Sequence, residues 1–275
     1  MQCFLQDYGL KPRMSHHIIY TLTLGFIACD EKSMNKILTI VIGLLFCGTV
    51  SAQQIIEWRD LDTSTDSYQR VVYYKQGKKK PLDGTYRIKR GSDEEVVSLN
   101  KGLMNGPYLR LRDGILREEG YYVDGMRNGP FVEYYQDGVT HRKDTPMKAG
   151  KIDGKVTTYY SDGKIESEKE YRRSLEHGIE RRYSQASGEV LIEGQWIDGK
   201  KEGEWRERFD AGGGVSGTKV QHYRDGELDG PYLVEMTKDG EPYLTIRGQF
   251  TAGRKSGKWS QYDATLGNTR EWEEK

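Results

Sequence analysis

Two glycine-rich segments resemble phosphate-binding loops when only their letters are read. Residues 212–217 (Gly-Gly-Gly-Val-Ser-Gly) fit the G-x-G-x-x-G pattern, which binds a dinucleotide only between a strand and a helix. No helical period follows this segment, so we interpret it as an enlarged turn. Residues 253–258 place three residues between two glycines, whereas a phosphate loop needs four, followed by a hydroxyl residue where Trp259 stands. The sequence therefore predicts no cofactor.

The imidazole and acidic side chains do not form a recognisable catalytic or metal-binding set. Three histidines lie beyond residue 52, and no two of them have the spacing of metal ligands: His141, His177 and His222. A row of glutamates on one face of a predicted strand resembles the paired carboxylates of a glycosidase, but it is more typical of a solvated sheet face: Glu166, Glu168 and Glu170. We predict no catalytic residue, no metal site and no enzymatic activity.

Adjacent tyrosines are the remaining pattern that could recognise a ligand. Consecutive residues of a strand point to opposite faces, so one ring of each pair is expected in the core. The second ring could join a ladder that binds sugar rings or the apolar side chains of a partner. Cross-strand packing without any ligand is the alternative. The candidate residues are Tyr134, Tyr135, Tyr159, Tyr160, Tyr183 and Tyr262.

The elements that position these residues follow from an internal repeat. Eight glycines recur at spacings of 22 to 27 residues: Gly84, Gly106, Gly129, Gly154, Gly178, Gly203, Gly230 and Gly257. Six of the residues four positions before them are glycine, with Lys80 and Ser174 as the exceptions. Six of the residues two positions after them are aromatic, with Val156 and Glu180 as the exceptions. Eight copies in phase indicate a repeat protein.

Each repeat has the pattern of a β-hairpin. Residues 131–135 (Phe-Val-Glu-Tyr-Tyr) are strand formers, and Asp137-Gly138 is a turn dipeptide ahead of a second extended segment. A lone hairpin is marginally stable in water, so neighbouring hairpins must stack. We predict an all-β fold, an elongated array of about eight hairpins in a single twisted antiparallel sheet. Residues 53–72 would form an N-terminal cap, 73–272 the repeats and 273–275 a tail.

Charge and composition agree with this fold class. The 42 Lys and Arg residues balance 42 Asp and Glu residues, so no basic field favours nucleic acid. The chain has 33 glycines and 19 tyrosines against 6 phenylalanines, a composition that fits neither an aliphatic α/β core nor a helical bundle. All three cysteines precede residue 53, so the repeats must be stable without disulfides.

The first 52 residues differ from the rest of the chain. Residues 37–50 form an apolar run that follows Lys36 and precedes Ser51-Ala52, a pattern typical of a cleavable signal peptide. We predict a signal peptide helix over residues 34–52, and we interpret residues 1–33 as an upstream extension or a mis-called start. Two alternatives are an uncleaved anchor and a lipoprotein box at residues 26–29 (Phe-Ile-Ala-Cys).

The motif Gly-x3-Gly-x-aromatic, followed by a strand, Asp-Gly and a second strand that ends in Tyr, resembles the MORN repeat. It is most similar to the divergent bacterial variant found in proteins described as antitoxin-like. The resemblance covers roughly residues 73–272 and is weakest at Lys80 and at Ser174-Gly178-Glu180, which we interpret as a cap and a bent or inserted repeat. The resemblance implies an elongated hairpin scaffold for contacts with proteins and, in some settings, with lipid.

These observations lead to three functional hypotheses. We expect an exported, non-catalytic scaffold of the bacterial envelope that binds an unidentified protein in the periplasm, at the outer membrane surface or outside the cell. A cell-wall or polysaccharide-binding module is the second hypothesis, and an antitoxin-like or immunity protein is the third. No nucleic acid partner is expected, and the membrane is expected to be involved only through the signal peptide.

Overall fold

The computed structural model describes residues 53–274, which lie within one compact unit, Ser51–Lys275. The predicted signal peptide and the segment before it lie outside the described residues. The described part is built from β-strands and one short 3-10 helix, with no α-helix. The predicted all-β hairpin array is therefore confirmed.

Twenty-one strands follow one another along the chain with short turns between most of them. They are β1 (Gln54–Glu57), β2 (Leu61–Thr65), β3 (Val71–Lys75), β4 (Gly84–Arg90), β5 (Asp93–Asn100), β6 (Leu103–Arg112), β7 (Ile115–Val123), β8 (Met126–Arg127), β9 (Gly129–Tyr134), β10 (His141–Lys148), β11 (Lys151–Ile152), β12 (Gly154–Tyr159), β13 (Ile165–Arg172), β14 (Leu175–Tyr183), β15 (Val190–Ile197), β16 (Lys200–Gly212), β17 (Val215–Arg224), β18 (Glu227–Lys238), β19 (Glu241–Thr251), β20 (Arg254–Asp263) and β21 (Asn268–Glu274). The 3-10 helix η1 (Trp58–Asp60) lies between β1 and β2.

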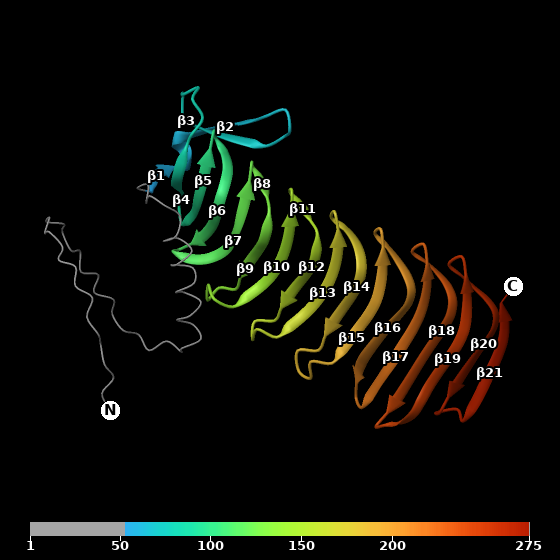
Figure 1. Cartoon of the computed structure of the whole chain (residues 1–275). Helices are drawn as coiled ribbons and strands as arrows, with labels where there is room; N and C mark the ends of the chain where they lie inside the picture. Colours follow the sequence, from blue (N-terminus) through green and yellow to red (C-terminus); the bar gives the residue numbers. More distant parts are fainter. Residues whose placement is uncertain (1–52, 275) are drawn as a thin grey trace, which may run out of the picture. The chain divides into compact units, whose positions relative to one another are not determined.

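Nineteen of these strands form one sheet. From β4 to β21 the strands pair antiparallel in chain order, with two exceptions at short strands: β7 pairs with both β8 and β9, and β10 pairs with β9, β11 and β12. Figure 1 shows these strands as curved arrows that stand side by side in sequence order. The last strand reaches Glu274, two residues past the predicted end of the repeats.

The N-terminal cap departs from the expected single antiparallel sheet. β1 pairs with β4 in parallel, with Gln54 opposite Tyr86, which makes the sheet mixed. β2 and β3 form a separate two-stranded sheet. A parallel neighbour needs a crossover of about a dozen residues or more, and the segment that contains η1, β2 and β3 supplies it. Repeat periodicity does not extend into this segment, so the parallel pair could not be predicted from the repeat pattern.

The turns that precede seven of the eight repeat glycines use two consecutive residues with positive φ. Asp198 and Gly199 have φ of 49° and 82°, as in the type I′ turns that match the twist of paired strands. Arg173 and Ser174 adopt φ of 53° and 70°, so Ser174 keeps the conformation that glycine has elsewhere. The unit at Ser174 therefore preserves the turn in spite of its divergent sequence.

The repeat glycines lie where the pairing of strands is offset. Gln221 lies opposite Tyr232, but Tyr223 lies opposite Leu228, so β18 contains two extra residues around Gly230. Gly230 has a φ of 124°, and a Cβ there would lie 2.9 Å from the Cβ of His222. The same offset recurs between β5 and β6, β15 and β16, and β19 and β20. Such bulges bend the strand and increase its twist.

Candidate functional site

One face of the sheet carries a continuous row of packed side chains, which we call the aromatic face. The row alternates between the residue two positions after each repeat glycine and a residue on the preceding strand. Its members are Tyr86, Val97, Tyr108, Gly120, Phe131, Thr145, Val156, Lys169, Glu180, Gly194, Trp205, Gln221, Tyr232, Gly248, Trp259 and Trp272. Phe131 is 1% exposed and Trp259 2% exposed. This row is the core of the array.

Side-chain sizes are matched along the aromatic face. Trp205 stands over Gly194 and Trp259 stands over Gly248, so closely that a Cβ on either glycine would overlap the indole. Val156 replaces the ring in one repeat, and there Thr145 stands at the position of Gly194, next to the Asp144–Thr157 pair of β10 and β12. Protein interiors tolerate little change of volume, so the residue at one of these positions limits the size of the residue at the other.

Glu180 replaces an aromatic residue in this row and is itself buried, with 3% of its surface exposed. Its carboxylate accepts hydrogen bonds from the Lys169 ammonium at 3.0 Å, Arg182 Nε at 3.0 Å and Trp196 Nε1 at 2.8 Å. Burial acts to raise the pKa of Glu180, but the bonds from Lys169 and Trp196 outweigh burial and lower the pKa. The glutamate is therefore held as a charged, fully bonded core residue.

The opposite side of the middle repeats, which we call the tyrosine face, carries three candidate tyrosines from the sequence analysis. Each donates its hydroxyl to a carboxylate fifteen residues earlier: Tyr134 to Glu119 at 2.6 Å, Tyr159 to Asp144 at 2.7 Å and Tyr183 to Glu168 at 2.8 Å. His141 packs edge-on between the rings of Tyr134 and Tyr159, with centroids 5.2 Å and 5.9 Å away. We call the row of Tyr134, Tyr159 and Tyr183 the ladder, and its hydrogen bonds link each repeat to the preceding one.

Tyr135 and Tyr160 link each repeat to the following one. Tyr135 donates its hydroxyl to the backbone oxygen of Tyr159 at 2.5 Å, and Tyr160 donates to the backbone oxygen of Tyr183 at 2.7 Å. Five of the six candidate tyrosines are thus engaged in bonds within the array. Burial and the bond to Asp144 raise the pKa of Tyr159 to about 12, so its hydroxyl remains a proton donor at neutral pH. Tyr262 stands apart from this ladder and is 37% exposed.

The other sequence patterns fall on turns and ion pairs. Gly212, Gly213 and Gly214 all have positive φ and connect β16 to β17, which confirms the predicted glycine-rich turn. Gly253 has a φ of 75° in the turn between β19 and β20. Glu168 does not lie on a fully solvated face as expected, because it accepts the Tyr183 bond and pairs with Lys155.

The three histidines lie in separate repeats. His141 Nδ1 lies 2.8 Å from Asp144, whereas His177 Nδ1 lies 3.3 Å from Asp198 without the alignment of a hydrogen bond. His222 Nδ1 lies 3.1 Å from the backbone oxygen of Pro231. Over residues 53–274, no cluster of three or more His, Cys, Asp or Glu side chains could hold a metal ion.

A pocket of about 410 Å³ opens on the aromatic face over β13 to β17, and we call it the Lys201 pocket. Lys169, Glu180, Arg182, Trp196, Lys201 and Trp205 line it, together with Ile192, Arg206, Glu207 and Gln221. Lys201 Nζ lies 4.0 Å from the centroid of the Trp205 ring and 5.0 Å from that of Tyr223. The arrangement combines indole rings with several cations.

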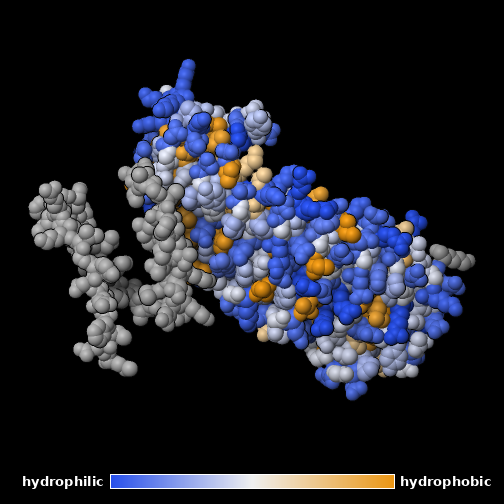
Figure 2. Space-filling view, viewed as in Figure 1, coloured by the Kyte–Doolittle hydropathy of each residue, from blue (hydrophilic) through white to orange (hydrophobic). Residues whose placement is uncertain are grey.

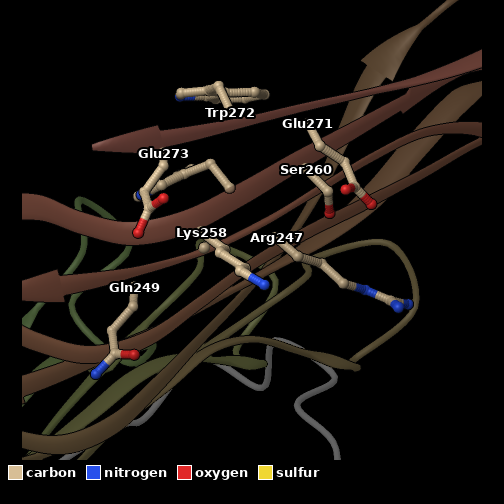
Figure 3. Close-up of a pocket in the computed structure, with 9 residues that line it drawn as sticks. Arg247, Gln249, Lys258, Ser260, Glu271, Trp272 and Glu273 are labelled. Atoms are coloured by element: carbon tan, nitrogen blue, oxygen red, sulfur yellow. The ribbon is translucent and has the colours of Figure 1, made fainter. Parts of the chain in front are cut away.

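A second hollow of about 560 Å³ lies at the C-terminal end of the array, among β19, β20 and β21. Figure 3 shows Trp272 on one side of the strands and Arg247, Gln249 and Lys258 on the other. Trp272 stacks on Trp259 with centroids 6.1 Å apart. The lining side chains diverge rather than converge on one point, so this hollow lacks the arrangement of a binding site.

Lys169, Lys201 and the small residues of the aromatic face are not among the candidate residues predicted from the sequence. A signal was available, because each small or charged partner lies nine residues before a repeat glycine: Val97, Gly120, Thr145, Lys169, Gly194, Gln221 and Gly248. Glycine stands at this position in the repeats that contain Phe131, Trp205 and Trp259, and lysine stands there in the repeat that contains Glu180. This complementarity becomes visible once adjacent repeats are compared in pairs.

Comparisons with known proteins add little to this description. No protein family matches the sequence, and no curated protein is similar to it. Among solved structures, a crystal structure of an S. aureus TarM mutant in complex with fondaparinux, α-GlcNAc-glycerol and UDP aligns with a TM-score of 0.16 at 12% identity. The alignment covers 61% of this chain and 24% of that structure. At this TM-score the likeness carries no argument about fold or activity.

No helix within residues 53–274 is long and apolar enough to cross a membrane.

Proposed function

We propose that the chain is a non-catalytic, MORN-like repeat scaffold that is exported to the bacterial envelope and binds another protein there. The observation that supports this function most directly is the use of the tyrosines. Both tyrosine rows serve the contacts between repeats, so their role is to stack hairpins into a broad sheet. A repeat array of this kind offers an extended surface for a partner.

The remaining surface favours a protein partner that is recognised through charge. Figure 2 shows a largely hydrophilic surface over the strands, with apolar residues in separate spots on the face drawn. Ion pairs such as Arg172–Asp198, Arg181–Glu193 and Arg247–Glu235 are distributed along the array. A partner with a complementary pattern of charges would gain specificity more than affinity from such a surface.

Capture from living cells tests the proposal. The full chain, tagged at its C-terminus, would be crosslinked in the native envelope, purified and analysed by mass spectrometry, with an unrelated exported protein of the same tag as the control. We expect one dominant protein that is missing from the control. Enrichment of peptidoglycan or polysaccharide sugars without any protein would contradict the proposal and support a glycan-binding module.

A direct glycan test complements this capture. We expect no retention of the chain on purified peptidoglycan, because the Tyr135 and Tyr160 hydroxyls are bonded within the array. Retention that is lost in the double variant Tyr135→Ala, Tyr160→Ala would contradict this expectation.

A further inference from the structure

Lys201 has an unusual environment within the Lys201 pocket. Its ammonium lies against the rings of Trp205 and Tyr223 and 6.0 Å from the centroid of Trp196. The side chain is half-buried, and no carboxylate within residues 53–274 forms an ion pair with it at 4.0 Å or less. Cation–π contacts compensate only part of the cost of withdrawing an ammonium from water.

The charges around Lys201 are unbalanced toward positive. The carboxylate of Glu180 is shared by Lys169 and Arg182, and Glu207 is paired with Lys219. The side chains on this face of the pocket include three cations, Lys169, Arg182 and Lys201, against Glu180 and Glu207, a difference of 3 − 2 = +1, because Arg206 points to the opposite face and pairs there with Glu204. Burial lowers the pKa of Lys201, and the negative charge of Glu180 offsets only part of this effect. An anion bound next to Lys201 would offset the excess positive charge and would stabilise the charged form of its ammonium group.

We propose that the Lys201 pocket binds a carboxylate side chain from an acidic segment of a protein partner. This inference rests on the proposed function, since it names the chemistry by which the scaffold would recognise its partner. A carboxylate that enters the pocket would form charge-assisted hydrogen bonds with the Lys201 ammonium. A volume of about 410 Å³ fits one or two acidic side chains rather than a folded domain.

The same geometry disfavours a sugar. Carbohydrate rings stack on open aromatic faces, but the Lys201 ammonium lies 4.0 Å from the Trp205 ring centroid and the Lys169 ammonium lies 4.9 Å from that of Trp196. The edge of one indole also packs on the other, with centroids 5.4 Å apart at 90°. The accessible chemistry of the pocket is therefore positive charge beside apolar ring surface.

Peptide binding to the purified full chain tests this site. The probe is a tri-glutamate peptide with blocked ends, measured by calorimetry and by the tryptophan fluorescence of the protein. We expect saturable binding of this peptide and none of tri-glutamine. Lys201→Met should weaken binding at least tenfold, and Lys201→Arg should retain most of it, because arginine keeps the charge.

Lys200→Met is the matched control. Lys200 precedes Lys201 on β16, points to the opposite face as its neighbour in a strand, and pairs with Asp225 in solvent. Its loss should leave binding unchanged. Melting curves and circular dichroism identify any variant that fails to fold, and Lys201→Arg then provides the comparison.

Three results would overturn the inference: equal weakening by Lys200→Met and Lys201→Met, no saturable binding of tri-glutamate, or preferential binding of a galacturonate trimer. The test is separable from that of the proposed function. If crosslinking captures a protein equally well with Lys201→Met, the pocket is wrong and the scaffold function stands. If tri-glutamate binds but no protein is captured from cells, the scaffold function fails.

Discussion

At the scale of single residues, the replacement of an aromatic ring by Glu180 introduces a titratable group into the core. Its carboxylate is charged in the folded array because Lys169, Arg182 and Trp196 donate to it. The folded state therefore lowers the pKa of Glu180 below its ordinary value. A carboxyl group of this kind stabilises the fold above its unfolded pKa of roughly 4.3 and loses that contribution as pH falls through the folded value.

We expect Glu180→Gln to lower the free energy of unfolding by about 2–4 kcal/mol between pH 5 and 7, because Lys169 keeps a charge without its buried partner. The difference should shrink as the pH falls below the unfolded pKa of Glu180 and through its lower pKa in the folded state, where Glu180 itself becomes protonated. Urea unfolding at several pH values measures both effects. The control is Glu204→Gln, since Glu204 forms an exposed pair with Arg206 worth about 0–1 kcal/mol. A difference for Glu180→Gln that is constant from pH 3 to 7 would contradict this account.

At the scale of strands, the fit of side chains on the aromatic face depends on the pairing of large and small residues. Trp205 on β16 covers Gly194 on β15 so closely that a Cβ has no room. The protein also uses the pair Thr145 and Val156 at the equivalent positions of another repeat. The same sheet therefore contains two combinations of side chains at equivalent positions, glycine with tryptophan and threonine with valine.

We expect Gly194→Ala to destabilise the protein by about 1–3 kcal/mol through overpacking against the indole. The double variant Gly194→Thr, Trp205→Val copies the pair at Thr145 and Val156, so it should be more stable than the sum of its single changes predicts. Thermal or urea unfolding of the four proteins forms the double-mutant cycle. Additive single effects would show that the two positions do not pack as a unit.

The strands also show which parts of the fold could be predicted from the sequence and which could not. The eight glycines and the turn dipeptides predicted the hairpins, because a positive φ restricts the residue type at a known position. The partners of the aromatic residues were missed, because they are defined only by contacts between adjacent repeats. The ladder from Tyr134 to Tyr183 was expected to be a binding surface or packing, and its bonds to Glu119, Asp144 and Glu168 could not be derived from one repeat alone.

At the scale of the whole array, the face of the sheet that carries packed aromatic rings differs between the end repeats and the middle repeats. Rings cluster on the aromatic face near the two ends, as Tyr108, Tyr122 and Phe131, and as Tyr232, Phe250, Trp259 and Trp272. In the middle repeats that face carries Val156 and Glu180 instead. The tyrosine face supplies rings in those repeats, so the ladder replaces the missing aromatic core.

We expect Tyr159→Ala to open the array locally. Loss of the ring and of its bond to Asp144 should raise amide hydrogen exchange in β12 and β13 about tenfold or more, equivalent to about 1.4 kcal/mol. Protection at the two ends should persist, because contacts in a repeat array are made mainly between neighbours. Tyr262→Ala is the control, since Tyr262 has the same offset in its repeat but stands outside the ladder. Uniform loss of protection along the chain would indicate a single cooperative unit instead.

The meander of strands has a mechanical consequence. From β5 to β21 each strand is bonded to strands that lie one or two elements away along the chain, so tension applied between the two ends would load the strand pairs one after another. The sheet would unzip from β21, where nothing described lies beyond the last strand, rather than shear along many bonds together. Each released hairpin of about 25 residues adds roughly 85 Å of extended chain. Such a protein would behave as an extensible tether that lengthens in steps under load and refolds when the load is removed.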